Sequence, residues 1–157
     1  MRRITEIIIH CSATPEGKDF TVDDIRRWHL ARNFADIGYH YVIYRDGSVH
    51  KGRAENIAGA HCLGHNANSM GICYIGGVAK DGKTPKDTRT PQQKQALRQL
   101  VQQLQFVYPH ERCMGTMSIQ AKLALHLMYR KTYESLYLSH NHVAVPSHFV
   151  QKYAQSL

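Results

Sequence analysis

The stretch IIIHCSAT, residues 7–14, combines a short apolar run with residue types that carry chemistry. Three consecutive isoleucines are typical of a buried strand, and we expect that strand to span residues 4–10. His10 stands at its end, where a histidine is either a structural residue or a metal ligand. Cys11 follows directly, and neighbouring side chains of a strand point to opposite faces. We therefore expect Cys11 to be a core thiol that shares no site with His10.

The bulk composition is that of one soluble globular domain. The chain has 157 residues, with 43% hydrophobic and 20% charged residues, which suffices for a core of its own. No apolar run approaches the roughly 18 residues of a membrane span, and the start MRRITEIII lacks the pattern of a secretory signal. We expect a protein that is made in the cytoplasm, does not insert into a membrane, and leaves the cell only by release or another secretion route.

Charge and residue counts narrow the classes of partner. The formal net charge is +8, with 20 basic and 12 acidic residues, which favours an anionic polymer as partner. No motif of interleaved basic and aromatic residues accompanies this charge, so nucleic acid is not an expected partner. Four cysteines lack CxxC spacing and are expected to be free thiols. Eleven histidines are more than such a chain usually carries, and they hint at metal or proton-transfer chemistry.

Two helices are predicted from capping signals and apolar spacing. Thr21 is a candidate N-cap, and Ile25 and Trp28 after it are spaced for one helical face. Thr90 begins a second helix over residues 91–107, where a proline opens the first turn and a glutamine completes a capping box. Leucines at helical spacing make this second helix amphipathic.

The other expected elements alternate with these helices. GYHYVIYRDGSVHKGR is a β-hairpin pattern that turns at Asp46-Gly47. GICYIGGV, residues 71–78, is typical of one buried strand, and we expect its paired glycines to terminate that strand. The remaining expectations are a helix over 118–132, a strand over 135–139, and a terminal helix from Phe149. Interleaved strands and helices without a linker predict one α/β domain over residues 1–157.

Candidate metal ligands to accompany His10 lie far along the chain. A hydrolytic zinc site needs about three protein ligands and an open position for water. The stretch SHNHVAVPSH supplies His140, His142 and His148 within one expected loop. These histidines are the candidates to complete a site with His10.

Several long blocks resemble one enzyme family. They keep the family's order over residues 3–109 and read IIIHCSAT, IRRWH, GYHYVIYRDGSVHKGR and GAHCLGHNANSMGICYIGG. These blocks are similar to those of the zinc-dependent N-acetylmuramoyl-L-alanine amidases of the phage-lysozyme type, a superfamily that includes the peptidoglycan recognition proteins. The resemblance implies a central mixed β-sheet flanked by helices, with zinc held at one face.

The resemblance also implies roles for single residues. His10 matches the family's first zinc ligand, at the end of the first strand. Tyr39 matches the tyrosine that faces the zinc-bound water and stabilises the tetrahedral intermediate. His61 and Asn66 match positions that line the substrate groove. His65, by contrast, reads as a solvated loop residue.

The resemblance fails toward the end of the chain. Residues 110–157 diverge from the family, and 110–134 are additional or unlike it. The family places a histidine ligand and, about eight residues later, a cysteine or aspartate ligand, with a catalytic lysine often just before the latter. His148 lies eight residues after His140, which matches the family's spacing between these two ligands. We favour His140 and His148 as ligands, with His142 as an alternative ligand or proton shuttle. The other alignment puts Val145 at the position of the missing ligand, and neither alignment recovers the lysine.

These observations lead to one expected function and one alternative. The expected function is hydrolysis of the amide between N-acetylmuramic acid and L-alanine by zinc-activated water, with peptidoglycan as the partner and a monomer as the active form. The alternative is a peptidoglycan-binding module that kept the groove and lost the metal. Zinc content separates the two.

Overall fold

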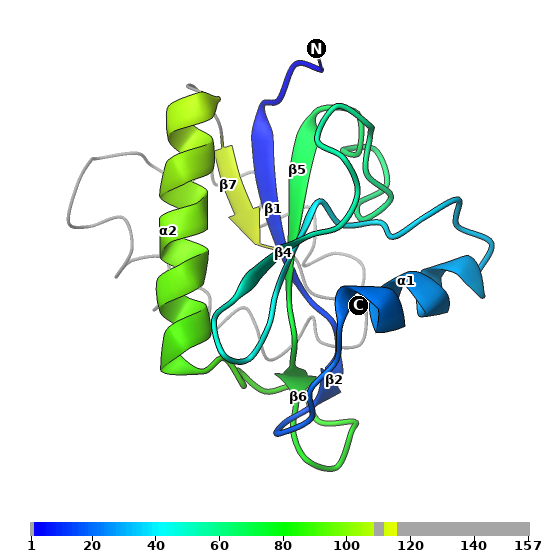
Figure 1. Ribbon diagram of the computed structural model, residues 1–157, viewed down its shortest axis with the longest axis vertical. Coiled ribbons are helices and arrows are strands. Elements are labelled where there is room, and N and C mark those ends of the chain that lie inside the picture. Colours follow the sequence, from blue (N-terminus) through cyan, green and yellow to red (C-terminus); the bar gives the residue numbers. More distant parts are fainter. Residues whose placement is uncertain (1, 109–111, 116–157) are drawn as a thin grey trace, which may run out of the picture. The chain divides into compact units, whose positions relative to one another are not determined.

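The computed structural model describes residues 2–108 and 112–115 (Figure 1). Within these two ranges, no helix is both long enough and apolar enough to cross a membrane. The expected helix at 118–132, the strand at 135–139 and the terminal helix from Phe149 lie outside the described residues. The extent of the domain, 1–157, therefore stays a prediction.

A five-stranded mixed sheet forms the centre of the described fold. Its order is β4-β3-β5-β1-β7, and only the pair β3 and β4 is antiparallel. The strands are β1 (Glu6–Cys11), β3 (Tyr41–Ile43), β4 (Val49–Lys51), β5 (Ser69–Tyr74) and β7 (Arg112–Gly115). The expected central mixed sheet with flanking helices is confirmed.

Strand β1 lies in the middle of the parallel strands. It pairs with β5 on one side, where His10 stands opposite Cys73, and with β7 on the other. Ile7 and Ile8 are completely buried, as expected for a strand covered on both faces. The strand begins two residues later than the sequence predicted and includes Cys11.

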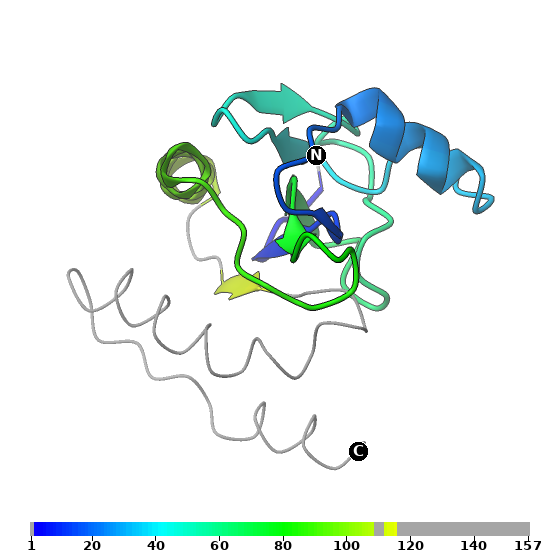
Figure 2. The ribbon, with the colours of Figure 1, turned by 90° about the horizontal axis from the view of Figure 1, so that it is seen from below.

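Helix α2 (Pro91–Val107) covers one face of the sheet. Thr90 and Gln93 form the expected capping box at its start. Apolar residues of α2 pack on alternate residues of the strands, among them Ile7, Ile9 and Cys11. The helix residues in this cluster are Ala96, Leu97, Leu100 and Leu104. Figure 2 shows α2 and the first helix on different sides of the sheet. The predicted helix is confirmed, and so is the expectation that Cys11 is a core thiol.

Gln93 also joins this helix to the sheet. Its buried Nε2 donates to the carbonyl oxygens of Ile43 at 3.2 Å and Ile75 at 2.9 Å. The Ile43 carbonyl also accepts from the backbone N–H of Ile75 at 3.0 Å, so Gln93 is a second donor to it. The two contacts of Gln93 hold the start of α2 against the ends of neighbouring strands and give its buried amide two acceptors.

Helix α1 (Val22–Leu30) covers the other face, with a capping box between Thr21 and Asp24. Ile25 is buried, whereas Trp28 is 38% exposed, although the two residues are spaced for one helical face. The Trp28 ring packs edge-on against Phe20. The buried stripe of this short helix ends in His29.

The predicted strand over 71–78 is in fact two elements. Strand β5 ends at Tyr74, and Gly77–Val78 form β6, which pairs with β2 (Thr14–Pro15) in a separate two-stranded sheet. Gly76 has a φ of 129°, a conformation that residues with a side chain rarely adopt. The chain therefore leaves the central sheet at the paired glycines, as expected of a strand terminator.

The predicted hairpin is confirmed. Tyr41 pairs with Lys51 and Ile43 with Val49. Gly47 at its turn has a φ of 89° and donates its N–H to the Tyr44 carbonyl at 2.9 Å. The hairpin places Tyr39 and His40 just before β3, beside the centre of the sheet.

Candidate active site

Three of the predicted site residues meet on the α1 side of the sheet. The ring centroids of His10 and Tyr39 are 5.2 Å apart, those of His10 and His61 are 5.0 Å apart, and those of Tyr39 and His61 are 6.3 Å apart. The three residues come from β1, from the segment before β3 and from the loop before β5. The fold thus brings together side chains that are far apart in sequence.

His10 is held on the rigid central strand. Its neighbour Cys11 packs on the α2 side, so the alternation of the strand directs His10 toward the α1 side. Its side chain is buried, and this burial lowers the pKa of its imidazole to about 4. The ring is therefore neutral near pH 7, which is the form that binds a metal.

Tyr39 stands beside His10 with its ring packed on that of His29 at a centroid distance of 5.3 Å. Burial raises the pKa of its hydroxyl well above the usual value, and the neighbouring thiols Cys73 and Cys11 raise it further. Cys73 is the residue opposite His10 in the next strand. The Tyr39 hydroxyl therefore keeps its proton and remains a hydrogen-bond donor.

His61 contacts His10 directly. Its Nδ1 lies 3.0 Å from Nε2 of His10, and its Nε2 lies 3.3 Å from Oγ of the buried Ser69. Burial, followed by the charges of His10 and His40, lowers the pKa of His61 to about 2. Two neutral imidazoles therefore face each other at this point.

Asn66 shapes the loop that carries His61. Its Oδ1 accepts hydrogen bonds from the backbone N–H groups of His61 at 2.8 Å and Cys62 at 2.9 Å. This contact supports the loop. The predicted contact of Asn66 with substrate stays a prediction.

His65 differs from its expected role as a solvated loop residue. It is partly buried, and its Nδ1 lies 2.7 Å from Oε2 of Glu6. The pair connects the loop of His61 to the start of β1. Because the partner is distant in sequence, no local pattern could have indicated it.

His40 is a buried histidine of the region that sequence reasoning missed. Its Nδ1 accepts from the N–H of Gly71 at 2.9 Å, while its own N–H donates to the Gly71 carbonyl at 2.9 Å. Its Nε2 lies 3.0 Å from the carbonyl of Ile57. The same Nε2 lies 3.0 Å from Nη2 of Arg2. Both ring nitrogens therefore have protein partners, and the role of His40 is structural.

Arg2 forms hydrogen bonds to two loops near His40 and His61. Its Nε donates to the carbonyl of Glu55 at 2.9 Å, and its Nη1 donates to the carbonyls of Asn66 at 3.1 Å and Ala67 at 3.0 Å. A guanidinium has five donors in a fixed plane, which suits several carbonyls at once. Arg2 thereby ties the loop after β4 to the loop before β5.

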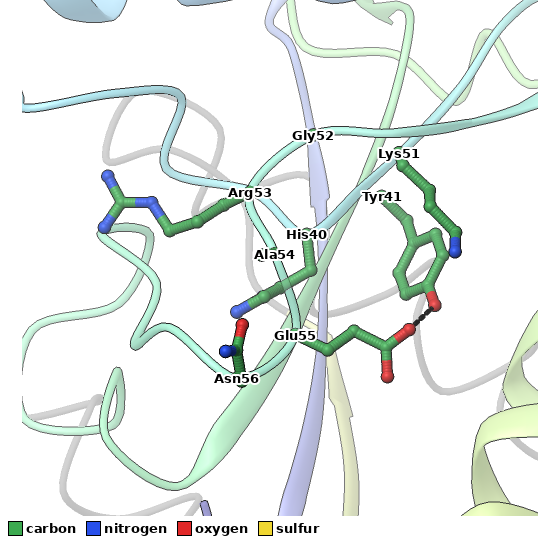
Figure 3. Close-up of a pocket in the computed structure, with 8 residues that line it drawn as sticks. All are labelled: His40, Tyr41, Lys51, Gly52, Arg53, Ala54, Glu55 and Asn56. Carbon is green, nitrogen blue, oxygen red and sulfur yellow. Dashed lines mark hydrogen bonds between the residues drawn. The ribbon is translucent and has the colours of Figure 1, made fainter.

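A separate cavity of about 470 Å³ lies at the end of the hairpin (Figure 3). Tyr41 and Glu55 in its wall are hydrogen-bonded to each other. Arg53 donates instead to the backbone carbonyls of Asp36, Ile37 and Ala58. Because these polar groups already bind the protein itself, the cavity is a weaker candidate than the cluster around His10.

No set of candidate metal ligands is assembled in the part of the chain that the structure describes. In that part, no group of three histidine, cysteine or acidic residues converges on one point. His140, His142 and His148, and the alternative position Val145, lie outside the described residues. The predicted ligand set therefore stays a prediction.

Comparisons with known proteins agree with this fold and site. The sequence pattern of the family described as N-acetylmuramoyl-L-alanine amidase matches residues 1–147. The endolysin of Klebsiella phage KP32 is 42% identical over 104 residues, which cover 66% of this chain and 68% of the relative.

Two solved structures share the fold. The N-acetylmuramoyl-L-alanine amidase LysC from Clostridium intestinale URNW has a TM-score of 0.62 at 28% identity, over 73% of this chain and 70% of its own. Drosophila PGRP-LB has a TM-score of 0.61 at 29% identity, over 73% and 70% of the two chains. The chain belongs to the N-acetylmuramoyl-L-alanine amidase family, and its endolysin and amidase relatives indicate peptidoglycan hydrolase activity.

Proposed function

We propose that this chain cleaves the amide between the lactyl group of N-acetylmuramic acid and L-alanine with a zinc-bound water. The observation that carries this proposal is the meeting of His10, Tyr39 and His61 on one face of the sheet. We infer that His10 holds the zinc ion together with His140 and His148, and that His142 is an alternative ligand or proton shuttle.

The chemistry of His10 fits a zinc ligand. Zinc in hydrolytic sites is bound by neutral imidazole, thiolate or carboxylate groups. The lowered pKa of His10 means that no proton has to be displaced near neutral pH. Its place on a strand buried on both faces gives the rigidity that a ligand position requires.

Each residue of the proposed site has a separate role in hydrolysis. When bound, zinc would supply a water of lowered pKa and polarise the scissile carbonyl. Tyr39, whose hydroxyl keeps its proton, donates a hydrogen bond to the carbonyl oxygen as negative charge develops there. His61, and Asn66 through the loop that it supports, line the proposed substrate groove.

Peptidoglycan as the substrate also fits the charge of the protein. A net charge of +8 attracts an anionic wall polymer and raises its local concentration at the surface. Because the relatives include a phage endolysin, we infer that the chain acts on the cell wall after release from the cell that makes it. A monomer remains the expected form.

Removal of metal tests this function. We expect the purified protein to release peptides with a new N-terminal L-alanine from peptidoglycan. Chelation should abolish the release and added zinc should restore it, because the attacking water depends on the ion. The new amino groups can be measured by derivatisation and mass spectrometry. Full release by the exhaustively chelated protein would contradict the zinc mechanism, and binding without any release would favour the non-catalytic module.

A second prediction decides between the two alignments of the last ligand. If His148 binds zinc, His148→Ala should lose the metal, whereas His148→Cys should retain it because thiolate is an equally good donor. If Val145 occupies the ligand position, His148→Ala should leave the metal content unchanged and Val145→Cys should raise zinc affinity. Metal analysis of the three variants beside the wild type distinguishes these outcomes.

A further inference from the structure

The segment before β1 contacts the loop that carries His61. Thr5 donates its N–H to the carbonyl of Asn68 at 2.8 Å. Arg2 lies three residues earlier, is partly buried, and donates to carbonyls of the same loop. Because Arg2 and Thr5 both precede the first strand, the loop is held by side-chain and backbone groups from outside the central sheet.

His61 is itself held at two points. Its backbone N–H donates to Oδ1 of Asn66 at 2.8 Å. Its ring Nε2 lies 3.3 Å from Oγ of Ser69, which is completely buried. One neighbouring side chain therefore fixes the backbone of His61, and the other fixes its ring.

Both of these neighbours give their main-chain carbonyl to Arg2. Nη1 of Arg2 donates to the carbonyl of Asn66 at 3.1 Å, and both Nη1 and Nη2 lie 3.4 Å from the carbonyl oxygen of Ser69. A guanidinium is planar and presents its five N–H donors at fixed angles. Arg2 therefore sets the positions of Asn66 and Ser69 relative to each other.

We propose that Arg2 is a positioning residue that holds Asn66 and Ser69 in the arrangement that places His61. Its effect on hydrolysis rests on the proposed function, in which His61 lines the substrate groove. Arg2 acts through its two neighbours and needs no contact with the substrate. Lysine is not an equivalent residue here, because an ammonium group is a point charge on a flexible stem and lacks the planar set of donors.

Amide hydrogen exchange tests the placement without substrate or metal. We expect Arg2→Ala to raise the exchange rate of the His61 amide about tenfold or more, relative to the amide of Ile8 in the core. The reason is that hydrogen bonds to a charged group stabilise a structure enough to change an opening equilibrium by that factor. Unchanged relative exchange at His61 in Arg2→Ala would overturn the proposal.

Two further variants separate geometry from charge. Arg3 is the next residue and is exposed, so Arg3→Ala removes the same charge and should leave exchange at His61 as in the wild type. Arg2→Lys keeps the charge and loses the planar donors, so His61 should exchange nearly as fast as in Arg2→Ala. Wild-type exchange in Arg2→Lys, or fast exchange in Arg3→Ala, would contradict the proposal because charge alone would then account for the effect.

A double-mutant cycle tests the consequence for hydrolysis. Arg2→Ala should raise KM on a defined muropeptide several-fold with a smaller change in kcat, because a residue that lines the groove contributes mainly to binding. In a protein that already carries His61→Ala, Arg2→Ala should cause no further rise in KM. A merely structural role would lower the melting temperature in both backgrounds and would show no such coupling in KM.

The two measurements distinguish the possible failures. Equal rises in KM in both backgrounds would show that Arg2 acts through its contacts with Glu55 or His40, and would overturn the proposal. A wild type that releases no peptide from peptidoglycan would refute the proposed function instead. The exchange rates of the His61 amide would still decide whether Arg2 places His61.

Discussion

Replacement of His10 by alanine is expected to remove both zinc and hydrolysis. His10 is the proposed ligand on β1, which is paired with a strand on each side, and a site of three ligands loses most of its affinity when one imidazole is removed. A catalytic metal contributes several kcal/mol to the transition state, so turnover on peptidoglycan should fall by at least about 10³-fold. Metal analysis and the rate of amide cleavage measure the two effects.

A second histidine provides the control for this variant. His50 lies on β4, where its ring stacks on Tyr44 at a centroid distance of 3.7 Å. His50→Ala removes an imidazole without touching the cluster around His10, so metal content and turnover should be those of the wild type. Stoichiometric zinc in His10→Ala would contradict the assignment of this ligand.

Tyr39→Phe is expected to keep zinc and fold while lowering turnover by about 10²–10³-fold, the usual effect of removing one oxyanion donor. The phenyl ring preserves the packing against His29 and His10, so the substitution isolates the hydroxyl. The loss should appear in kcat, because the hydrogen bond strengthens only as charge develops on the carbonyl oxygen. Steady-state kinetics on a defined muropeptide can measure it.

Tyr41→Phe is the matched control. Tyr41 belongs to the cluster on the α2 side, and its hydroxyl bonds to Glu55. Removing that hydroxyl should cost some stability and leave turnover unchanged. Equal activity of Tyr39→Phe and the wild type would contradict the oxyanion role of the hydroxyl and show that Tyr39 contributes only by packing.

Local signals in the sequence were sufficient to predict most of the helices and strands that the structure describes. The N-cap signal at Thr21 and the capping box at Thr90 place the starts of both helices, because the partners of each cap are only three residues away. The hairpin follows in the same way from its Asp46-Gly47 turn. Helical spacing indicates an apolar stripe but not its centre. Ile25 and Trp28 are spaced for one face, yet the buried stripe of α1 runs to His29.

The contacts that build the site were not visible in local patterns. His10 and Tyr39 could be assigned only through their resemblance to family motifs. The pairs His10–His61 and Glu6–His65 join residues more than 50 positions apart, and they depend on how the loop before β5 folds against β1. The division of residues 71–78 between two sheets likewise depends on a partner strand at Thr14–Pro15.

The position of β1 has a consequence for the order of events during folding. Its neighbours β5 and β7 both come far later in the chain, so Glu6 pairs with Ser69 and with Arg112. Contacts so distant in sequence incur a large loop-closure entropy and slow the folding of a chain. On the ribosome, Ile7–Ile9 must wait for more than one hundred further residues before both edges are covered. A nascent or truncated chain that ends before Arg112 would expose one edge of this apolar strand, which is a template for aggregation.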